Sequence, residues 1–337
     1  MAGLLHPLRF EGRVHQHELA SSILDGGRFD DPTTRHLYVY EPPGCEGRDL
    51  PAVLLLPGFT GTASNLLEVH PWKTGVVAAY DRAVAAGEHA PALLVLPDCW
   101  TRLGGSQYVN STYFGRYTDH LVQEVVPFVR EHHGAAAFGV AGKSSGGFGA
   151  MHLSLAHPEA FRAAGSISGD VDFELGYASE FAPACRGLVD HGADPAAFLE
   201  AFLRDPTLKG DDHAVLNVLA MAGCYSPAPG AELGFELPFD PRTAERRPEV
   251  WERWLAFDPL VRIGQPAAQE AWRSLACLHL ECGLKDQFHL QWGLRKLSAR
   301  LTELGIEHDR EEHPGSHFDI NDRYGPVIDK LARALTS

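Results

Sequence analysis

The sequence predicts an α/β protein with a mostly parallel central sheet, flanking helices and an inserted cap of helices. Short apolar runs alternate with helical patterns before residue 170 and after residue 270, an order typical of parallel sheets. The run PALLVLPD (91–98) is apolar throughout, as expected of a strand buried on both faces. Residues 171–270 hold helical fragments and many prolines but no strong strand. We therefore assign residues 1–170 and 271–337 to the core and 171–270 to a helical cap.

Seven segments of the core are predicted to form strands. They are LYVYEP (37–42), PAVLLLPG (51–58), PALLVLPD (91–98), AAAFGVAG (135–142), FRAAGSISG (161–169), LACLHLECG (275–283) and IEHDREEH (306–313). Amphipathic patterns predict core helices at 74–87, 115–133, 146–158, 290–305 and a final one from about residue 324. Pro127 predicts a kink in the second of these helices.

The charge of the chain excludes two classes of partner. Of its 337 residues 29 are basic and 44 acidic, giving a net charge of −15. Such a surface repels nucleic acid and anionic membranes, so we expect a small-molecule partner. No apolar run approaches the roughly 20 residues that span a bilayer, and residues 1–13 lack the pattern of a signal peptide. The sequence thus predicts a cytoplasmic protein and leaves homo-oligomer formation open.

Cysteines and histidines give no sign of a metal or a cofactor. The six cysteines form no C-x-x-C pair, and in a chain of this length they predict free thiols. The 18 histidines form no H-E-x-x-H or comparable set of ligands, so we predict no metal site and no cofactor.

The stretch AFGVAGKSSGGFGA (137–150) fits two active-site patterns. Ala137 to Ser144 resembles a P-loop for nucleotide phosphates, and Gly142 to Gly146 is the G-x-S-x-G turn that presents a nucleophilic serine. A P-loop strand would have to be EHHGAA (131–136), which has little strand character. The apolar run continues instead to Gly142, and the glycines after Ser144 suit a tight turn better than a helix interior. We therefore predict that Ser144 is a nucleophile.

A nucleophilic serine needs a histidine base and an acid that orients it. Asp286 follows the strand at 275–283, and His317 follows the last strand, so both stand in the order Ser, acid, His that is found in α/β-hydrolases. Asp170, at the end of another strand, is an alternative acid. His313 is an alternative base, but we expect the sheet to hold it.

The oxyanion of a tetrahedral intermediate needs two backbone N–H donors. One comes from the residue after the nucleophile, Ser145. The loop PGFTGTASN (57–65) follows an early strand and is rich in glycine, so we predict Phe59 as the second donor and Thr60 as its alternative.

The segment GGSQYVNSTYFGRY (104–117) follows another core strand and is expected beside the site. Tyr108, Asn110 or Ser111 would then contact substrate, or the segment would only hold a long loop in place. Trp100 is a further candidate wall of the pocket, and Thr60 is a further candidate for contact with substrate.

Together these motifs resemble the putative-esterase family of α/β-hydrolases, which includes S-formylglutathione hydrolases, feruloyl esterases, siderophore esterases and mycolyltransferases. The matching segments are PGFTGT, GGSQYVNS, GKSSGGFGAM, GLKDQF and PGSHF, which span residues from about 50 to 320. Lys143 stands where histidine is commoner in the family. The resemblance implies the α/β-hydrolase fold and a serine esterase.

We accordingly expect hydrolysis of small to medium acyl esters through an acyl-enzyme on Ser144, His317 and Asp286. A thioesterase or an acyltransferase would use the same three residues. A non-catalytic binding protein on this fold would be expected to lack one of them, and the sequence retains all three.

Overall fold

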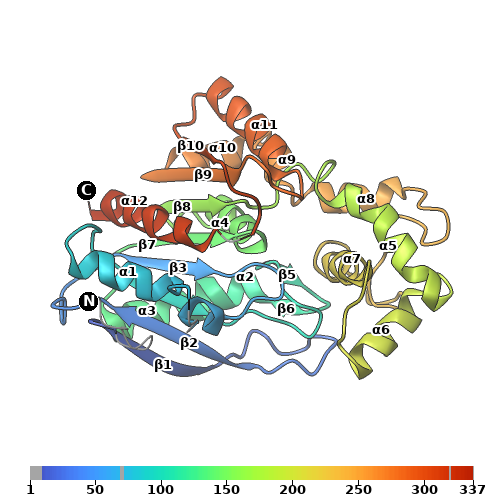
Figure 1. Ribbon diagram of the computed structural model, residues 1–337, viewed down its shortest axis with the longest axis horizontal. Helices are drawn as coiled ribbons and strands as arrows, with labels where there is room; N and C mark the ends of the chain where they lie inside the picture. Colours follow the sequence, from blue (N-terminus) through green and yellow to red (C-terminus); the bar gives the residue numbers. More distant parts are fainter. Residues whose placement is uncertain (1–9, 69–71, 319, 337) are drawn as a thin grey trace.

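The computed structural model describes residues 10–68, 72–318 and 320–336, and its core is an eight-stranded sheet (Figure 1). The strand order is β1-β2-β4-β3-β7-β8-β9-β10. The strands are β1 Arg13–Ala20, β2 Thr34–Glu41, β3 Ala52–Leu56, β4 Leu93–Pro97, β7 Phe138–Lys143, β8 Ala163–Ile167, β9 Cys277–Gly283 and β10 Asp309–His313. Neighbours from β4 to β10 pair in parallel, whereas β2 is antiparallel to both β1 and β4. The mostly parallel sheet is as predicted.

Helices cover both faces of the sheet. The core helices are α1 Val76–Ala85, α2 Tyr117–His120, α3 Val126–His133, α4 Ser145–Ala156, α11 Leu290–Glu303 and α12 Tyr324–Thr336. The side chains of β3 alternate between the faces: Val53 and Leu55 join the cluster with α1 and α12, and Leu54 and Leu56 join the cluster with α3, α4 and α11. This alternation follows from the period of two in a strand, and it explains why β3 is apolar at every position.

Strand β1 lies outside the sequence prediction. Its sequence, RVHQHELA, carries few apolar residues, yet all eight residues pair with β2 at the edge of the sheet. Most of its side chains are exposed or half-buried, because an edge strand is covered on fewer sides than a central one. Backbone pairing therefore holds a strand that hydrophobic periodicity cannot reveal.

The helix predicted over 115–133 is interrupted. It comprises α2, a π-helical turn at Leu121–Val125 and then α3, which contains Pro127 near its start. Proline has no N–H to donate to the preceding turn, and the wider π turn directly before it accommodates the missing hydrogen bond.

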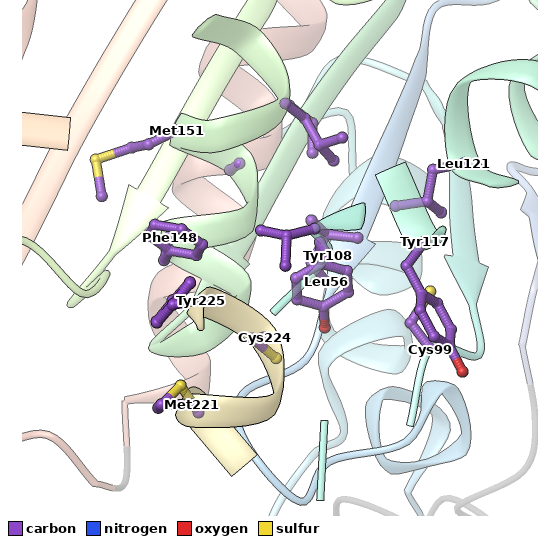
Figure 2. Packing of buried hydrophobic residues seen from close by; sticks show 14 of the residues in the cluster. Leu56, Cys99, Tyr108, Tyr117, Leu121, Phe148, Met151, Met221, Cys224 and Tyr225 are labelled. Carbon is purple, nitrogen blue, oxygen red and sulfur yellow. The ribbon is translucent and has the colours of Figure 1, made fainter. Parts of the chain in front are cut away.

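The segment between β8 and β9 is helical, as the composition of residues 171–270 suggested. Its helices are α5 Phe181–Gly187, α6 Pro195–Arg204, α7 Asp212–Tyr225, α8 Pro248–Leu255, α9 Pro259–Arg262 and α10 Pro266–Arg273. Helices α5 to α8 lie beyond one end of the sheet (Figure 1). Figure 2 shows Tyr225 of α7 beside Phe148 of α4, and their ring centroids are 5.8 Å apart. The insertion thus shares one hydrophobic cluster with the core.

All six cysteines are free thiols, as predicted, and four of them are buried. No helix among the described residues is long and apolar enough to cross a membrane. Residues 1–9, which bear on the prediction about a signal peptide, lie outside the described part of the chain, and the cytoplasmic location stays a prediction.

His152 of α4 predicts a loss of stability in acid. Its Nδ1 lies 2.9 Å from Arg262 Nη1, and its Nε2 lies 3.3 Å from Thr118 Oγ1. Because Nδ1 accepts a hydrogen bond from the guanidinium, it cannot also carry a proton, and the ring is neutral. Burial, and then the charge of Arg262, lower the pKa of His152 from 6.5 to about 3. The unfolded chain therefore binds a proton that the folded chain does not, and the stabilisation present above pH 6.5 is lost as the pH falls toward 3.

The expected slope from this one group is about 1.4 kcal/mol per pH unit in that window. Urea unfolding at several pH values should show a shallower acid slope for His152→Gln than for the wild type. Equal slopes in the two proteins would contradict a neutral His152.

Candidate active site

Ser144 occupies a sharp turn between strand β7 and helix α4. Its backbone has φ 58° and ψ −125°, a conformation that is costly for any residue other than glycine. Two hydrogen bonds hold it, from Ser144 N–H to Ile167 O and from Phe148 N–H to Ser144 O, each at 2.9 Å. Residues 138–143 are strand and supply no coil for a phosphate, so the P-loop alternative is wrong.

Glycines around Ser144 allow the turn to pack. A Cβ on Gly146 would lie 1.9 Å from Leu56 O, and one on Gly142 would lie 2.4 Å from Gly146 C. Backbone atoms cannot move aside as a flexible side chain can. The spacing Gly142-x-Ser144-x-Gly146 is therefore a steric requirement of this turn.

Replacement of Gly146 by alanine should prevent the native turn from forming. We expect a loss in free energy of unfolding of about 3 kcal/mol or more, because the added methyl overlaps the Leu56 carbonyl. Gly230→Ala is the matched control, since nothing lies within 4 Å of a Cβ there and its φ is not positive. Thermal unfolding followed by circular dichroism measures both, and a Gly146→Ala protein as stable as the control would contradict the predicted clash.

The two other predicted catalytic residues lie next to Ser144. His317 Nε2 is 2.9 Å from Ser144 Oγ, and His317 Nδ1 is 2.7 Å from Asp286 Oδ2. Strands β9 and β10 pair in parallel, so the loops that follow them meet at the same edge of the sheet as the turn after β7. Hydrogen bonds between these loops, such as Lys285 N–H to Gly315 O at 3.0 Å, keep Asp286 and His317 together.

The Asp286 carboxylate is held as an ion. Oδ1 accepts the Phe288 N–H at 2.9 Å, and the Cys282 thiol lies 3.6 Å from Oδ2. Burial opposes the charge, but the hydrogen bond and the charge of His317 outweigh it, and the net effect lowers the pKa of Asp286. An ionised carboxylate at Nδ1 fixes the tautomer in which Nε2 can accept the proton of Ser144.

The alternative acid, Asp170, and the alternative base, His313, take no part in the hydrogen bonds that join Ser144, His317 and Asp286. The Asp170 carboxylate accepts from Tyr177 OH at 2.7 Å and from Gln107 Nε2 at 3.2 Å rather than from His317. His313 ends β10, as expected, and its Nδ1 accepts the Gly315 N–H at 3.2 Å. Within the described part of the chain, no hydrogen bond joins either side chain to Ser144.

The loop 57–61 lies against the nucleophile. A Cβ on Gly58 would be 3.3 Å from Ser144 Cβ, and Tyr108 OH fixes the loop through a 2.6 Å hydrogen bond to Pro57 O. Thr60 N–H already donates to Gly104 O at 3.1 Å, which leaves Phe59 as the better placed of the two predicted donors.

Ser145 begins helix α4, and the first hydrogen bond of the helix is donated by Phe148. The N–H of Ser145 therefore has no acceptor within the helix. Ser145 and Phe59 both line the cavity at Ser144.

The triad opens into a cavity of about 350 Å³. One wall comes from the loop 57–61 and from the triad loops, with Phe288 and Phe318. The opposite wall comes from the insertion, with Val171, Phe173 and Tyr177. The cavity therefore lies between the carboxyl ends of the strands and the helical insertion, where α/β proteins bind ligands.

The predicted pocket residues other than Thr60 do not line this cavity. Tyr108 is buried behind the loop that its hydroxyl fixes, and its ring packs against Gly149. Asn110 faces away and exchanges hydrogen bonds with Asp119. The Trp100 ring stacks under the Arg35 guanidinium. Ser111 is buried and donates to Gly223 O at 2.5 Å. This segment therefore holds the loop and the insertion together, which is the second of the two roles predicted for it.

Several residues of the cavity that the sequence did not reveal come from the insertion. They include Val171, Phe173, Tyr177, Glu180, His213 and Asn217. Val171 and Phe173 lie in the loop after β8, and the other four lie in helices with ordinary packing patterns, so only their tertiary position distinguishes them. Gln107, next to the predicted Tyr108, is the residue of its segment that reaches toward the site, through its hydrogen bond to Asp170.

One cluster among the described residues has the donor atoms for a metal ion: His279, Glu281 and Glu311. Arg323 donates to Glu281 Oε1 at 2.9 Å and also contacts Glu311, so a guanidinium already neutralises the cluster. None of these residues lines the cavity. The cluster is an ion-pair network between β9, β10 and the residues before α12.

Solved structures with the same fold include several esterases. A ferulic acid esterase shares 17% sequence identity with a TM-score of 0.62, over 97% of this chain and all of its own. An S-formylglutathione hydrolase from Agrobacterium tumefaciens shares 15% identity with a TM-score of 0.56, over 97% of this chain and 96% of its own. The fluorophosphonate-binding serine hydrolase FphF of Staphylococcus aureus shares 15% with a TM-score of 0.57, over 97% and 99%. No curated protein matches the chain.

These neighbours confirm the α/β-hydrolase fold that the motifs indicated. The family model described as "Putative esterase" matches residues 32–317, which is most of the chain, from just before β2 to His317. The resemblance drawn from the sequence motifs is thus confirmed at the level of the family. This chain belongs to the "Putative esterase" family.

Proposed function

We propose that the protein is a serine carboxylic ester hydrolase that acts through an acyl-enzyme on small to medium acyl esters. The observation that carries the proposal is the pair of contacts at His317, 2.9 Å to Ser144 Oγ and 2.7 Å to Asp286 Oδ2. This chain of contacts is the arrangement that makes a serine hydroxyl nucleophilic at neutral pH.

In the first half-reaction Ser144 Oγ attacks the ester carbonyl while His317 Nε2 takes its proton. The N–H groups of Phe59 and Ser145 hold the oxyanion of the tetrahedral intermediate. His317 returns the proton to the alkoxide as the bond to the alcohol breaks, which leaves the acyl group on Ser144. Water then attacks the acyl-enzyme by the same route, and the acid leaves with regeneration of the hydroxyl.

Labelling with a fluorophosphonate tests the nucleophile, and turnover of nitrophenyl esters of increasing chain length tests the reaction. We expect one adduct, located by mass spectrometry on the peptide with Ser144, and hydrolysis that declines once the acyl chain exceeds the cavity. Ser274→Ala is the control variant, and it should be labelled at Ser144 like the wild type, because the Ser274 hydroxyl only donates to Ala271 O. Absence of both the adduct and hydrolysis would favour a non-catalytic binding protein.

The same triad could serve a thioesterase or an acyltransferase. One of the similar structures is named as an S-formylglutathione hydrolase, whose substrate is a thioester. Comparing an ester with its thioester, each with and without an added alcohol, separates the three reactions. An ester hydrolase favours the oxygen ester and gives the free acid even when the alcohol is present.

A further inference from the structure

Asp170 is a carboxylate of the cavity that the proposed mechanism does not use. Both hydrogen bonds that it accepts go to Oδ2, from Tyr177 OH at 2.7 Å and from Gln107 Nε2 at 3.2 Å. Within the described part of the chain, Oδ1 has no hydrogen-bond partner. The residue is partly exposed and lines the cavity beside Ser144 and His317. One oxygen is therefore held by the protein, and the other is left for a ligand.

The donors to Asp170 are themselves fixed. Gln107 is 1% exposed, and its Nε2 also contacts Tyr177 OH at 2.7 Å and Tyr225 OH at 3.2 Å. The ring of Tyr177 packs edge-on against Phe173 and Trp254, with centroids 4.7 Å and 5.8 Å apart. A carboxylate held by such a network keeps its direction without a ligand, which reduces the entropy cost of binding one.

The charged side chains around the cavity are mainly acidic. Glu68 and Glu180 line it together with Asp170, whereas Lys143 is its one lining lysine or arginine within the described residues. Burial lowers the pKa of the lining residue His213, which is therefore uncharged at neutral pH. With a chain charge of −15, the cavity attracts cations and repels anions.

We propose that Asp170 is a specificity-determining residue that binds an ammonium group on the acyl or alcohol part of the ester, so that cationic esters are the preferred substrates. The inference rests on the proposed esterase function. The apolar side chains Val171 and Phe173 line the same cavity, and an ion pair is stronger where water is largely excluded. Burial raises the pKa of Asp170 and the hydrogen bonds from Tyr177 oppose this shift. A bound ammonium would stabilise the ionised form further.

Matched esters test the proposal. We would compare nitrophenyl esters of hexanoic acid that carry a terminal ammonium, hydroxyl or methyl group. Acetylcholine and its uncharged carbon isostere, dimethylbutyl acetate, test the alcohol side. The wild type should prefer the charged member of at least one series, with a kcat/KM ratio over the uncharged ester of about 10 to 100. Asp170→Asn keeps the shape and should bring this ratio near one.

Glu252→Gln, on the exposed side of α8, is the control that removes one negative charge outside the cavity, and it should retain the wild-type ratio. An unchanged ratio in Asp170→Asn would overturn the proposal, as would a wild-type preference for the hydroxyl ester over the ammonium ester. If the wild type hydrolyses none of the esters, the proposed function fails. Calorimetric binding of the same esters to Ser144→Ala, with and without Asp170→Asn, then still decides whether Asp170 selects ammonium.

Discussion

Replacement of Ser144 by alanine should lower kcat for ester hydrolysis by a factor of about 10⁴ to 10⁶. The hydroxyl is the atom that forms the acyl-enzyme, and His317 Nε2 at 2.9 Å is the base that activates it. Without Oγ no acyl-enzyme can form, so the covalent route to the product is lost. Some rate above that in water should remain, because the N–H groups of Phe59 and Ser145 still stabilise the oxyanion.

The measurement is kcat on the best nitrophenyl ester, together with a circular dichroism spectrum to show that the variant is folded. The substitution removes only one oxygen from a turn that backbone hydrogen bonds hold, so we expect a native spectrum. A folded Ser144→Ala protein that retains wild-type turnover would remove Ser144 from the mechanism. It would leave the membership of the family untouched.

Replacement of Asp286 by asparagine should lower kcat by about 10⁴ at neutral pH. The carboxylate accepts a hydrogen bond from the His317 Nδ1–H, with 2.7 Å between Nδ1 and Oδ2. In the variant, the oxygen of the asparagine amide still accepts the Phe288 N–H, so its NH₂ group faces His317 Nδ1. The histidine would then carry its proton on Nε2, where it cannot accept from Ser144.

The control for this variant is Asp170→Asn, which alters the other carboxylate near His317. For an uncharged ester its loss in kcat should be far smaller than that of Asp286→Asn, because Asp170 contacts Tyr177 and Gln107 rather than the imidazole. The reverse order of the two losses would assign the acid to Asp170.

The catalytic turn was predictable because its chemistry and its sterics are local. The strand that ends at Lys143, the glycines on either side of Ser144 and the helix that begins at Ser145 are consecutive in the sequence. The order of Asp286 and His317, each directly after a strand, follows from the parallel sheet, since parallel strands end at the same edge. The edge strand β1 and the π turn before Pro127 were not predicted, because pairing at an edge and the accommodation of a proline leave little trace in hydrophobic periodicity.

The walls of the cavity were not predictable in the same way. Tyr108 and Gln107 are neighbours in one motif, but the hydroxyl of Tyr108 binds Pro57 O behind the loop and the amide of Gln107 reaches Asp170. Both have positive φ, which turns their side chains in directions that a regular strand or helix would not give. Tyr177 lies in the insertion, far from the motifs that mark the triad.

The sequence by itself determined the order of the elements, the nucleophilic turn and the residues that could follow it as acid and base, because short-range sterics and strand order fix them. Tertiary packing alone decided which wall the insertion presents to Ser144, which oxygen of Asp170 remains open, and that Tyr108 supports the loop instead of touching a ligand. These outcomes depend on how distant helices pack on the sheet, and a helical pattern records only that a face is buried, not what it is buried against.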